Sequence, residues 1–153
     1  MFKLLIVSHM PTDNLHAMTR AVVDGASNEA IEEVELDLKQ ALQTGPEDVL
    51  NADAIILGTS ENFGYMSGGM KDFFDRIYYP CLDKTESLPY AMFIRAGNDG
   101  LGAQSSIERI AKGLGWKMVQ APLICRGRWQ DSFLEECENL GMTLAAGLEA
   151  GVF

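Results

Sequence analysis

The chain has 153 residues, of which 47% are hydrophobic, and 22 acidic against 12 basic residues give it a net charge of −10. This length fits one domain over residues 1–153, with an apolar fraction typical of a globular core. The excess of acid disfavours nucleic acid and anionic membranes as partners, because both need concentrated Lys and Arg. The charge is equally consistent with docking to a basic protein and with simple solubility.

The start of the chain and its cysteines narrow the setting in which it works. Met1–Val7 lacks the pattern of a signal peptide, and no apolar run approaches the roughly 20 residues that cross a bilayer. We therefore expect a soluble, cytoplasmic protein. Cys81, Cys125 and Cys137 form no CxxC pair, which favours buried thiols in a reducing compartment over a zinc site.

The first third of the chain predicts two strands and two helices. Lys3–Val7 is a continuous apolar run, as in a strand buried on both faces. Asp13–Gly25 has helical periodicity, and its glycine can end the helix. Val34–Leu38 alternates apolar and acidic residues, which indicates a strand near the sheet edge. A short helix should follow, with Pro46 in an early position.

The middle of the chain continues this alternation. Ala54–Leu57 predicts a second strongly buried strand, and Tyr90–Ile94 another. Between them, Met70–Tyr79 predicts a helix with aromatic residues on its core face. Pro80 should stop that helix, because proline lacks the N–H that a helix interior needs.

The last third completes an α/β pattern, with a helix over Ser105–Leu114, a fifth strand over Met118–Cys125 and a final helix from Asp131. Alternating strands and helices predict a parallel sheet covered on both faces. Five such units predict a flavodoxin-like doubly wound sheet of order 2-1-3-4-5. Ligands in this architecture bind beyond the carboxyl ends of the strands, so function should lie in three loops: residues 8–14, 59–68 and 96–103.

The first loop, residues 8–14, suits a phosphate. It leads into a helix N-terminus, which offers free N–H groups and a partial positive charge. Ser8 and Thr12 add hydroxyls and Asn14 an amide, and the loop has no Lys or Arg. Simple capping of the helix by Thr12 or Asp13 is the alternative.

The second loop is the most informative, because it combines glycines with Phe63 and Tyr65. Either ring could stack on a flat ligand such as a flavin, while Thr59, Ser60 and Asn62 supply polar groups. The alternative is a surface loop whose aromatic residues fold back onto the core.

The third loop, residues 96–103, is also rich in glycine. Its N–H groups could bind the pyrimidine edge of a flavin, although capping of the next helix explains it equally well. The chain has no GxGxxG or GxxxxGK[ST] motif after the first strand, which disfavours dinucleotide and ATP sites. A receiver module is also disfavoured, because its acidic cluster and phosphorylated Asp are replaced by Ser8-His9 and Thr59-Ser60.

The segment GTSENFGYMSGGMKDFFDRIYYP resembles the second flavin loop and following helix of flavodoxin-fold NAD(P)H-dependent FMN and quinone reductases. The positions that match that family's motif are Gly58, Thr59, Phe63, Gly64, Ser67, Gly68, Lys71, Phe73 and Asp75. Ser60 replaces a frequent proline. The first loop is similar to the family's phosphate loop at Thr12 and Asn14. The Thr-x-Thr-Gly-x-Thr loop of electron-carrier flavodoxins and the usual Gly-Gly pair of the third loop are absent.

The resemblance implies that FMN binds without a covalent bond, its phosphate at the first loop, its ring at the second and its pyrimidine edge at the third. The implied cofactor-binding residues are Ser8, Met10, Pro11, Thr12, Asp13, Asn14, Leu15, Thr59, Ser60, Glu61, Asn62, Phe63, Gly64, Tyr65, Ala96, Gly97, Asn98, Asp99 and Gly102. Because the flavin carries the chemistry, no catalytic side chain is assigned. Tyr65 is a candidate wall of an acceptor pocket, whereas His9 and His16 are interpreted as structural or surface residues.

Two functions follow from the resemblance. The first is an oxidoreductase that passes electrons from NAD(P)H through FMN to a quinone, a flavin or a similar acceptor. The second is a flavodoxin-type electron carrier that a partner reductase reduces, for which the short acidic chain argues. Many relatives form homodimers or homotetramers over the flavin, so the resemblance also implies that a second copy could contribute to the site.

Overall fold

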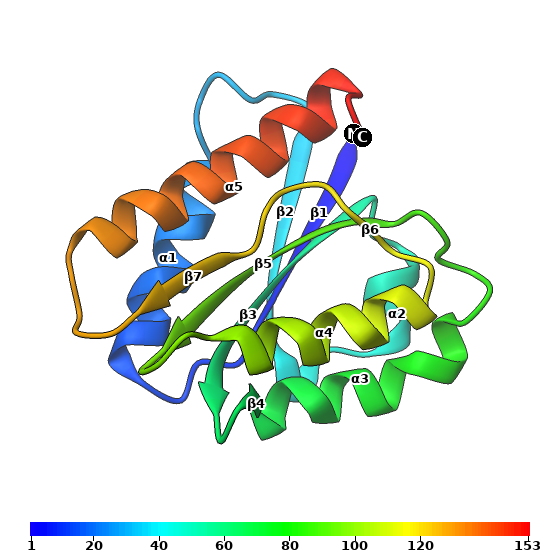
Figure 1. The fold of residues 1–153 in the computed structure, drawn as a ribbon. Helices are drawn as coiled ribbons and strands as arrows, with labels where there is room; N and C mark the ends of the chain where they lie inside the picture. Colours follow the sequence, from blue (N-terminus) through cyan, green and yellow to red (C-terminus); the bar gives the residue numbers. More distant parts are fainter.

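The computed structural model describes residues 1–153 and shows a mainly parallel sheet between two layers of helices (Figure 1). The strands are β1 (Phe2–Ser8), β2 (Val34–Gln40), β3 (Ala54–Asn62), β4 (Tyr65–Met66), β5 (Pro89–Ala96), β6 (Lys117–Met118) and β7 (Leu123–Arg126). The helices are α1 (Asp13–Ala26), a 3-10 turn η1 (Ala41–Gln43), α2 (Pro46–Leu50), α3 (Gly68–Cys81), α4 (Leu101–Gly113) and α5 (Ser132–Ala150).

The sheet confirms the predicted strand order. Its path is β2-β1-β3-β5-β6, and β7 also pairs with β5. All of these pairs are parallel, and only the short β4 runs antiparallel, against the end of β3. With β6 and β7 as the two parts of the predicted fifth strand, this is the order 2-1-3-4-5. The flavodoxin-like prediction is therefore correct, and the first switch point lies between β1 and β3.

Two strand predictions need correction. The fifth strand is not continuous over Met118–Cys125, because residues 119–122 leave the sheet between β6 and β7. Pro122 has no N–H to give to a sheet ladder, which explains a break at this place. The second predicted loop is also partly strand, since β3 continues to Asn62 and turns back into β4.

The helices also differ from prediction at their ends, α3 for example beginning at Gly68 and not at Met70. α1 runs to Ala26, one residue past the glycine that was expected to end it. α3 contains Pro80 in its last turn and ends at Cys81, because a proline this close to the end removes few helical hydrogen bonds. α4 begins at Leu101 and not at Ser105, so the third loop is shorter than predicted.

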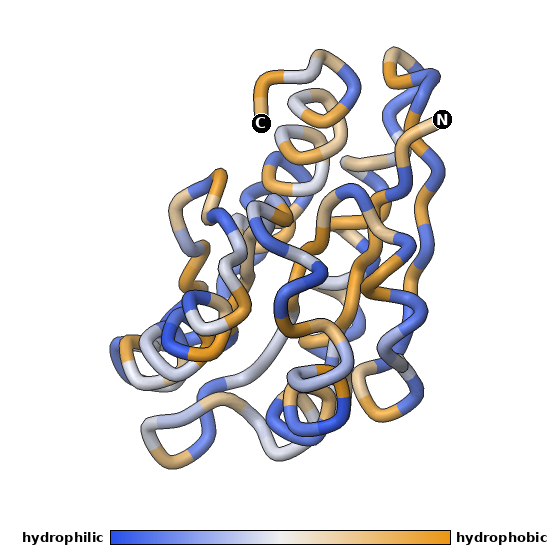
Figure 2. The backbone as a smooth tube through the Cα atoms, turned by 90° about the vertical axis from the view of Figure 1, so that its right-hand side faces the viewer, coloured by the Kyte–Doolittle hydropathy of each residue, from blue (hydrophilic) through white to orange (hydrophobic).

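A hydrophobic core lies on each face of the sheet. Leu4 and Ile6 of β1 pack toward α1 and α5, whereas Leu5 and Val7 of the same strand pack toward α3 and α4. This alternation is what a strand buried on both faces requires. Figure 2 shows the hydrophobic residues gathered in the central strands. The rigid sheet places the ends of β1, β3 and β5 side by side at one edge.

The cysteines lie inside these two cores, as predicted. Cys81, Cys125 and Cys137 are all buried and free. A hydrogen bond with Cys125, together with burial, raises the pKa of the Cys137 thiol well above its usual range, so this thiol stays protonated. No helix in the structure combines the length and the apolar character that crossing a membrane requires.

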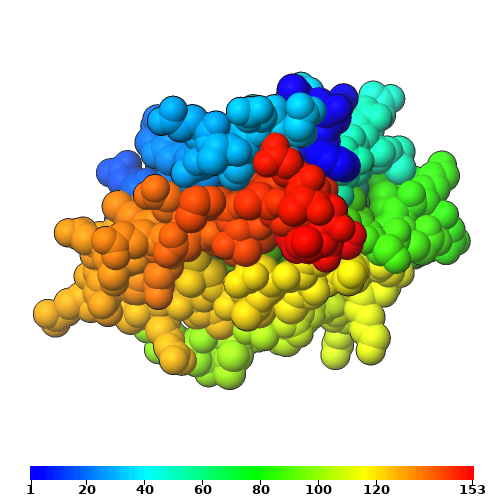
Figure 3. All heavy atoms as spheres, turned by 90° about the horizontal axis from the view of Figure 1, so that it is seen from above, coloured from blue at the N-terminus to red at the C-terminus, as the bar shows by residue number.

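The α1–α5 contact depends on two glycines. A methyl group on Gly25 would overlap the backbone carbonyl of Glu138 in α5, and one on Gly141 would overlap the carbonyl of Val22 in α1. The two helices therefore touch backbone to backbone, and α5 lies along the blue chain segment that includes α1 (Figure 3). Gly25 serves this packing and does not end its helix.

We expect Gly141→Ala to lower the free energy of unfolding by about 1–3 kcal/mol, because the added methyl group must push two helix backbones apart. This loss outweighs the gain of about 1 kcal/mol in helix propensity. Urea unfolding followed by circular dichroism measures it. Gly68→Ala is the matched control, because a methyl group there meets nothing within 4 Å. An unchanged stability of Gly141→Ala would contradict the close packing.

Candidate ligand site at the carboxyl edge of the sheet

The first and second predicted loops meet through His9. The His9 N–H donates to the Gly58 carbonyl at 3.0 Å, and the His9 Nδ1 lies 2.8 Å from the Ser67 hydroxyl. The imidazole lies so close to the start of α3 that a methyl group on Gly69 would overlap it. His9 therefore joins the first loop to the beginning of α3.

Burial lowers the pKa of His9, which keeps its ring mainly neutral near pH 7. The Ser67 hydroxyl that it contacts also accepts the N–H of Met70 and so caps α3. Ser67 in turn bonds to Thr59, whose hydroxyl also donates to the carbonyl of Ser60. The result is a chain of paired polar groups beneath the candidate site. The prediction that His9 is structural is consistent with these contacts.

The second and third loops are joined by Glu61. Its Oε2 accepts the N–H groups of Gly102 at 3.0 Å and Ala103 at 3.2 Å, in the first turn of α4. A carboxylate at a helix N-terminus is stabilised by free N–H groups and by the helix dipole. The backbone of Gly64 also packs directly on Gly102, which leaves no room for a side chain there. Three loops, near positions 10, 62 and 99, therefore lie at one rim, as predicted.

The β3–β4 hairpin turns through Phe63 and Gly64, both in the left-handed region with φ of 54° and 70°. Two positive φ values are typical of the tight turns that connect antiparallel strands, but phenylalanine is an unusual residue there. Phe63 is fully exposed at the tip, so in this conformation it packs on neither the core nor the third loop. Tyr65 is 41% exposed and is the other aromatic side chain of this hairpin available to a ligand.

The start of α1 offers free hydrogen-bond donors. Thr12 caps the helix by accepting the N–H of Leu15 at 3.2 Å, so the capping that the sequence offered as an alternative for Thr12 or Asp13 is made by Thr12. The backbone N–H groups of Met10, Thr12, Asp13 and Asn14 have no acceptor within the protein. Four free donors at a positive helix end can hold a phosphate without any Lys or Arg.

The third loop is an open turn over Gly97–Gly100. A methyl group on Gly97 would meet nothing within 4 Å, so the space above it is free. Asp99 accepts the N–H of Leu101 at 3.0 Å, and Gly100 adopts a φ of 73° beneath Ile124. These contacts fix the turn, and the N–H groups of residues 97–100 have no acceptor within the protein.

Several predicted site residues have their side chains or N–H groups engaged inside the protein. The Ser8 hydroxyl is buried against Thr19 at 2.9 Å, and the Thr59 hydroxyl binds the Ser67 segment. In this structure both hydroxyls are buried and used in internal hydrogen bonds, and their predicted contact with a ligand stays a prediction. The residues turned inward in this way are Ser8, Leu15, Thr59, Ala96 and Gly102.

The remaining predicted residues lie at the rim, and several of them carry polar groups that are free. The Ser60 hydroxyl and the side-chain amides of Asn14, Asn62 and Asn98 make no hydrogen bond within the protein. The rim residues from the prediction are Met10, Pro11, Thr12, Asp13, Asn14, Ser60, Asn62, Phe63, Gly64, Tyr65, Gly97, Asn98 and Asp99. Glu61 is different, because its carboxylate holds the rim together and is not free for a ligand.

A separate cavity of about 320 Å³ lies behind the first loop, between α1 and β2. Met10 is its one wall residue from the predicted site, and its other walls include His16, Arg20 and Leu38. The second and third loops do not reach this cavity.

Comparison with known proteins identifies the family. Residues 14–129 match the family described as NADPH-dependent FMN reductase. A flavodoxin of Aquifex aeolicus (strain VF5) is 36% identical over 77 residues, a match that spans 50% of this chain and 40% of that protein.

Solved structures of low sequence identity share the fold. A flavodoxin from the domain Archaea superposes with a TM-score of 0.82 at 21% identity, over 97% of this chain and 99% of that one. A flavodoxin described as WrbA-like, from Agrobacterium tumefaciens, gives a TM-score of 0.77 at 21% identity, over 98% and 99% of the two chains. The fold is therefore flavodoxin-like, and the family match covers most of its length. The chain belongs to the NADPH-dependent FMN reductase family.

Proposed function

We propose that this chain binds FMN noncovalently across the three loops and transfers electrons from NAD(P)H to a quinone, a flavin or a similar small acceptor. The observation that carries the proposal is the row of free N–H groups at the start of α1, on the same rim as the β3–β4 hairpin and the open third loop. Family membership supports the cofactor, and the family's description supports NADPH as the reductant.

The donors at the first loop fit a phosphate monoester. The N–H groups of Met10, Thr12, Asp13 and Asn14 would surround it, and the dipole of α1 would stabilise its charge. Residues 8–14 contain no Lys or Arg, so these neutral donors would leave much of the phosphate charge uncompensated. That charge would oppose a further negative charge near it.

The second and third loops fit a flat ring. The space above Gly97 is open, and the exposed Tyr65 can supply an apolar wall. The free side chains of Ser60, Asn62 and Asn98 can bind polar edges of a ring or a sugar-alcohol chain. When bound, FMN supplies hydride and electron transfer. The protein itself has to bind, orient and shield the ring, and no side-chain acid or base is needed.

A flavodoxin-type electron carrier is the second candidate function. The similarity to the Aquifex flavodoxin and the net charge of −10 favour it, because an acidic surface suits a basic redox partner. A carrier would be reduced by a partner enzyme and not by nicotinamide.

Anaerobic reduction separates the two candidates. We expect the purified protein to be yellow when FMN is bound. Its flavin absorption band at about 450 nm should disappear when NADPH is added without other proteins. A yellow protein that keeps its colour until a reductase is added would be a carrier. A protein that stays colourless in excess FMN would rule out both functions.

Charge at the first loop provides a test of the phosphate position. We expect Thr12→Asp to weaken FMN binding by about tenfold or more, because its carboxylate would face the phosphate. Thr12→Asn is the matched control, since both variants can cap α1 and they differ only in charge. Quenching of free FMN fluorescence measures the dissociation constants. Equal affinities of the two variants would place the phosphate elsewhere.

The Glu61 contact provides a test of the rim itself. We expect Glu61→Ala to weaken FMN binding by about tenfold, because the change removes the contact between the hairpin and two N–H groups of α4. Hydrogen bonds to charged groups contribute about 1.5–3 kcal/mol each. Amide hydrogen exchange at Gly102 and Ala103 should become faster. Glu61→Gln keeps an acceptor oxygen and should retain most of the affinity. Slow exchange in Glu61→Ala would show that the contact does not hold the rim.

A further inference from the structure

The strand β2 forms one edge of the sheet. All of Val34–Gln40 pairs with β1 on one side, and no strand pairs with it on the other. No loop of the chain hydrogen-bonds to the backbone of residues 35–39. Figure 3 shows the blue and cyan segments, which include α1 and β2, along one side of the molecule. The outward N–H and C=O groups of this edge are therefore available to another strand.

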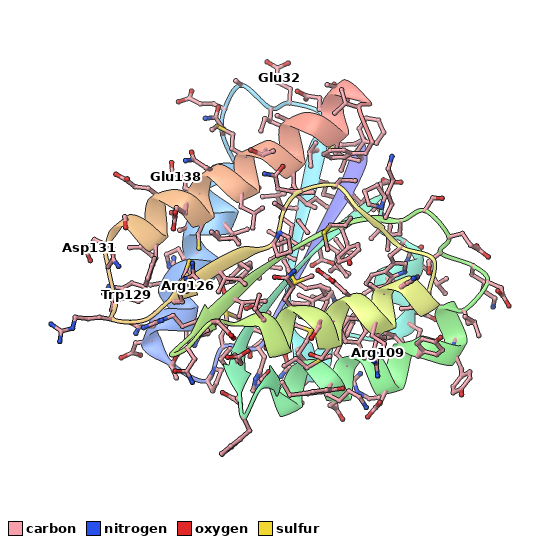
Figure 4. All side chains as sticks on the ribbon, in the orientation of Figure 1. Glu32, Arg109, Arg126, Trp129, Asp131 and Glu138 are labelled. Carbon is pink, nitrogen blue, oxygen red and sulfur yellow. The ribbon has the colours of Figure 1, made fainter.

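The edge strand is held in place at its start. Glu149 of α5 accepts the N–H groups of Glu32 at 2.7 Å and Glu33 at 2.6 Å. Figure 4 shows Glu32 on the loop that leads into β2, near the last turns of α5. A strand that is already fixed loses little further conformational entropy when another strand pairs with it.

Leu38 is the exposed apolar residue of this edge. Its neighbour in β1 is Ile6, which is buried in the core on the α1 and α5 side of the sheet, yet Leu38 is 45% exposed. The cavity of about 320 Å³ separates Leu38 from α1, and Val23 is another of its apolar walls. Exposed apolar surface beside an open strand edge would be removed from water by a strand that pairs there.

The charges along β2 select one register for pairing with a second copy. Opposed residues of antiparallel strands lie on the same face, so a two-fold axis through the sheet must pass beside one residue. An axis at Asp37 or at Lys39 would place identical charges opposite each other. An axis at Leu36 would oppose Glu35 and the partner's Asp37. An axis at Leu38 instead opposes Asp37 and the partner's Lys39, twice by symmetry.

The side chains in this register are free to pair. Asp37 is exposed and belongs to none of the three ion pairs in the structure. The Nζ of Lys39 lies 3.2 Å from Asp48, but a lysine ammonium has three donors and can bind a second carboxylate. Charged side chains on an edge strand usually prevent pairing. Here the opposed charges have opposite signs, so they favour it.

The same axis matches charges on α1. Arg20 and Asp24 lie one helical turn apart, and both line the cavity together with Leu38. Both are exposed, and neither belongs to an ion pair. The axis reverses the direction of the partner's helix, so Arg20 would face the partner's Asp24. A chain with a net charge of −10 repels a second copy over most of its surface, and pairing needs a patch of both signs such as this one.

We propose that this chain forms a homodimer in which the β2 strands of two copies pair antiparallel about Leu38 and continue the sheet through both chains. Such an interface is isologous, because each copy contributes the same residues. The second and third loops do not reach the cavity beside Leu38, so they stay open in this dimer. The inference is independent of the proposed redox function and differs from an oligomer that closes over a flavin.

Sedimentation velocity of the full chain, at about 50 µM with and without FMN, tests the dimer. We expect a dimer in both conditions. Arg20→Asp should weaken association by about tenfold or more, because it places two carboxylates opposite each other. The double variant Arg20→Asp/Asp24→Arg restores opposite signs and should restore the dimer. Arg109→Asp on α4 is the control away from β2, and its association should equal that of the wild type (Figure 4).

Disulfide trapping tests the register. Oxidation of Leu38→Cys should yield a covalent dimer, because this position faces its own copy across the axis. Glu35→Cys is the matched control on the same exposed strand. Its two copies would be six residues out of register, or about 20 Å apart along the strands, and should not be linked. The three natural cysteines are buried and contribute no cross-link.

The outcomes are decisive for the interface. A wild-type chain that remains monomeric overturns the proposal. A dimer that the Arg20→Asp variant does not weaken, or one that Glu35→Cys traps in place of Leu38→Cys, also overturns it, because another face or register would then be used. A dimer that forms only when FMN is added would indicate contact over the rim and would overturn it as well. A β2 dimer in a protein that binds no FMN would support this inference and refute the proposed function alone.

Discussion

The rim depends on one carboxylate. Glu61 lies at the end of β3 and accepts two N–H groups at the start of α4, so a single side chain connects the hairpin to the third loop. The contact is favourable because a helix N-terminus has unpaired donors and a partial positive charge. Gly102 completes it, since a larger residue would collide with the backbone of Gly64. Besides this connection, the hairpin contacts α4 through the N–H of Met66, which donates to the Ser106 hydroxyl at 3.2 Å.

Beneath the rim, internal hydrogen bonds fix the loops from below. His9, Ser67 and Thr59 form a continuous set of contacts between the first loop, the start of α3 and the end of β3. No buried side-chain nitrogen or oxygen lacks a hydrogen-bond partner. The structure therefore avoids the free-energy cost of an unpaired buried polar group. The same pairing occupies the Thr59 hydroxyl inside the protein. The polar groups that remain free all lie on the outer side of the loops.

The start of α1 offers an anion only neutral donors in this acidic protein. The N–H groups of Met10, Thr12, Asp13 and Asn14 have no acceptor within the protein, and residues 8–14 contain no Lys or Arg. Such donors would suit a phosphate held close to a redox centre, because the helix dipole stabilises part of its charge without a full positive charge beside it.

The sequence by itself determined the fold class, the strand order and the three loops at the carboxyl edge of the sheet, because hydrophobic periodicity and strand–helix alternation are local patterns. It also indicated buried cysteines and offered Thr12 or Asp13 as the cap of α1. Only the tertiary structure decided which loop side chains are buried and which are free at the rim. Glu61 and Gly102 are joined by a hydrogen bond although they lie 41 residues apart in the sequence. His9 and Ser67 are likewise joined across 58 residues. Local sequence patterns do not encode such partners, because the partners meet only after the sheet has aligned the ends of its strands.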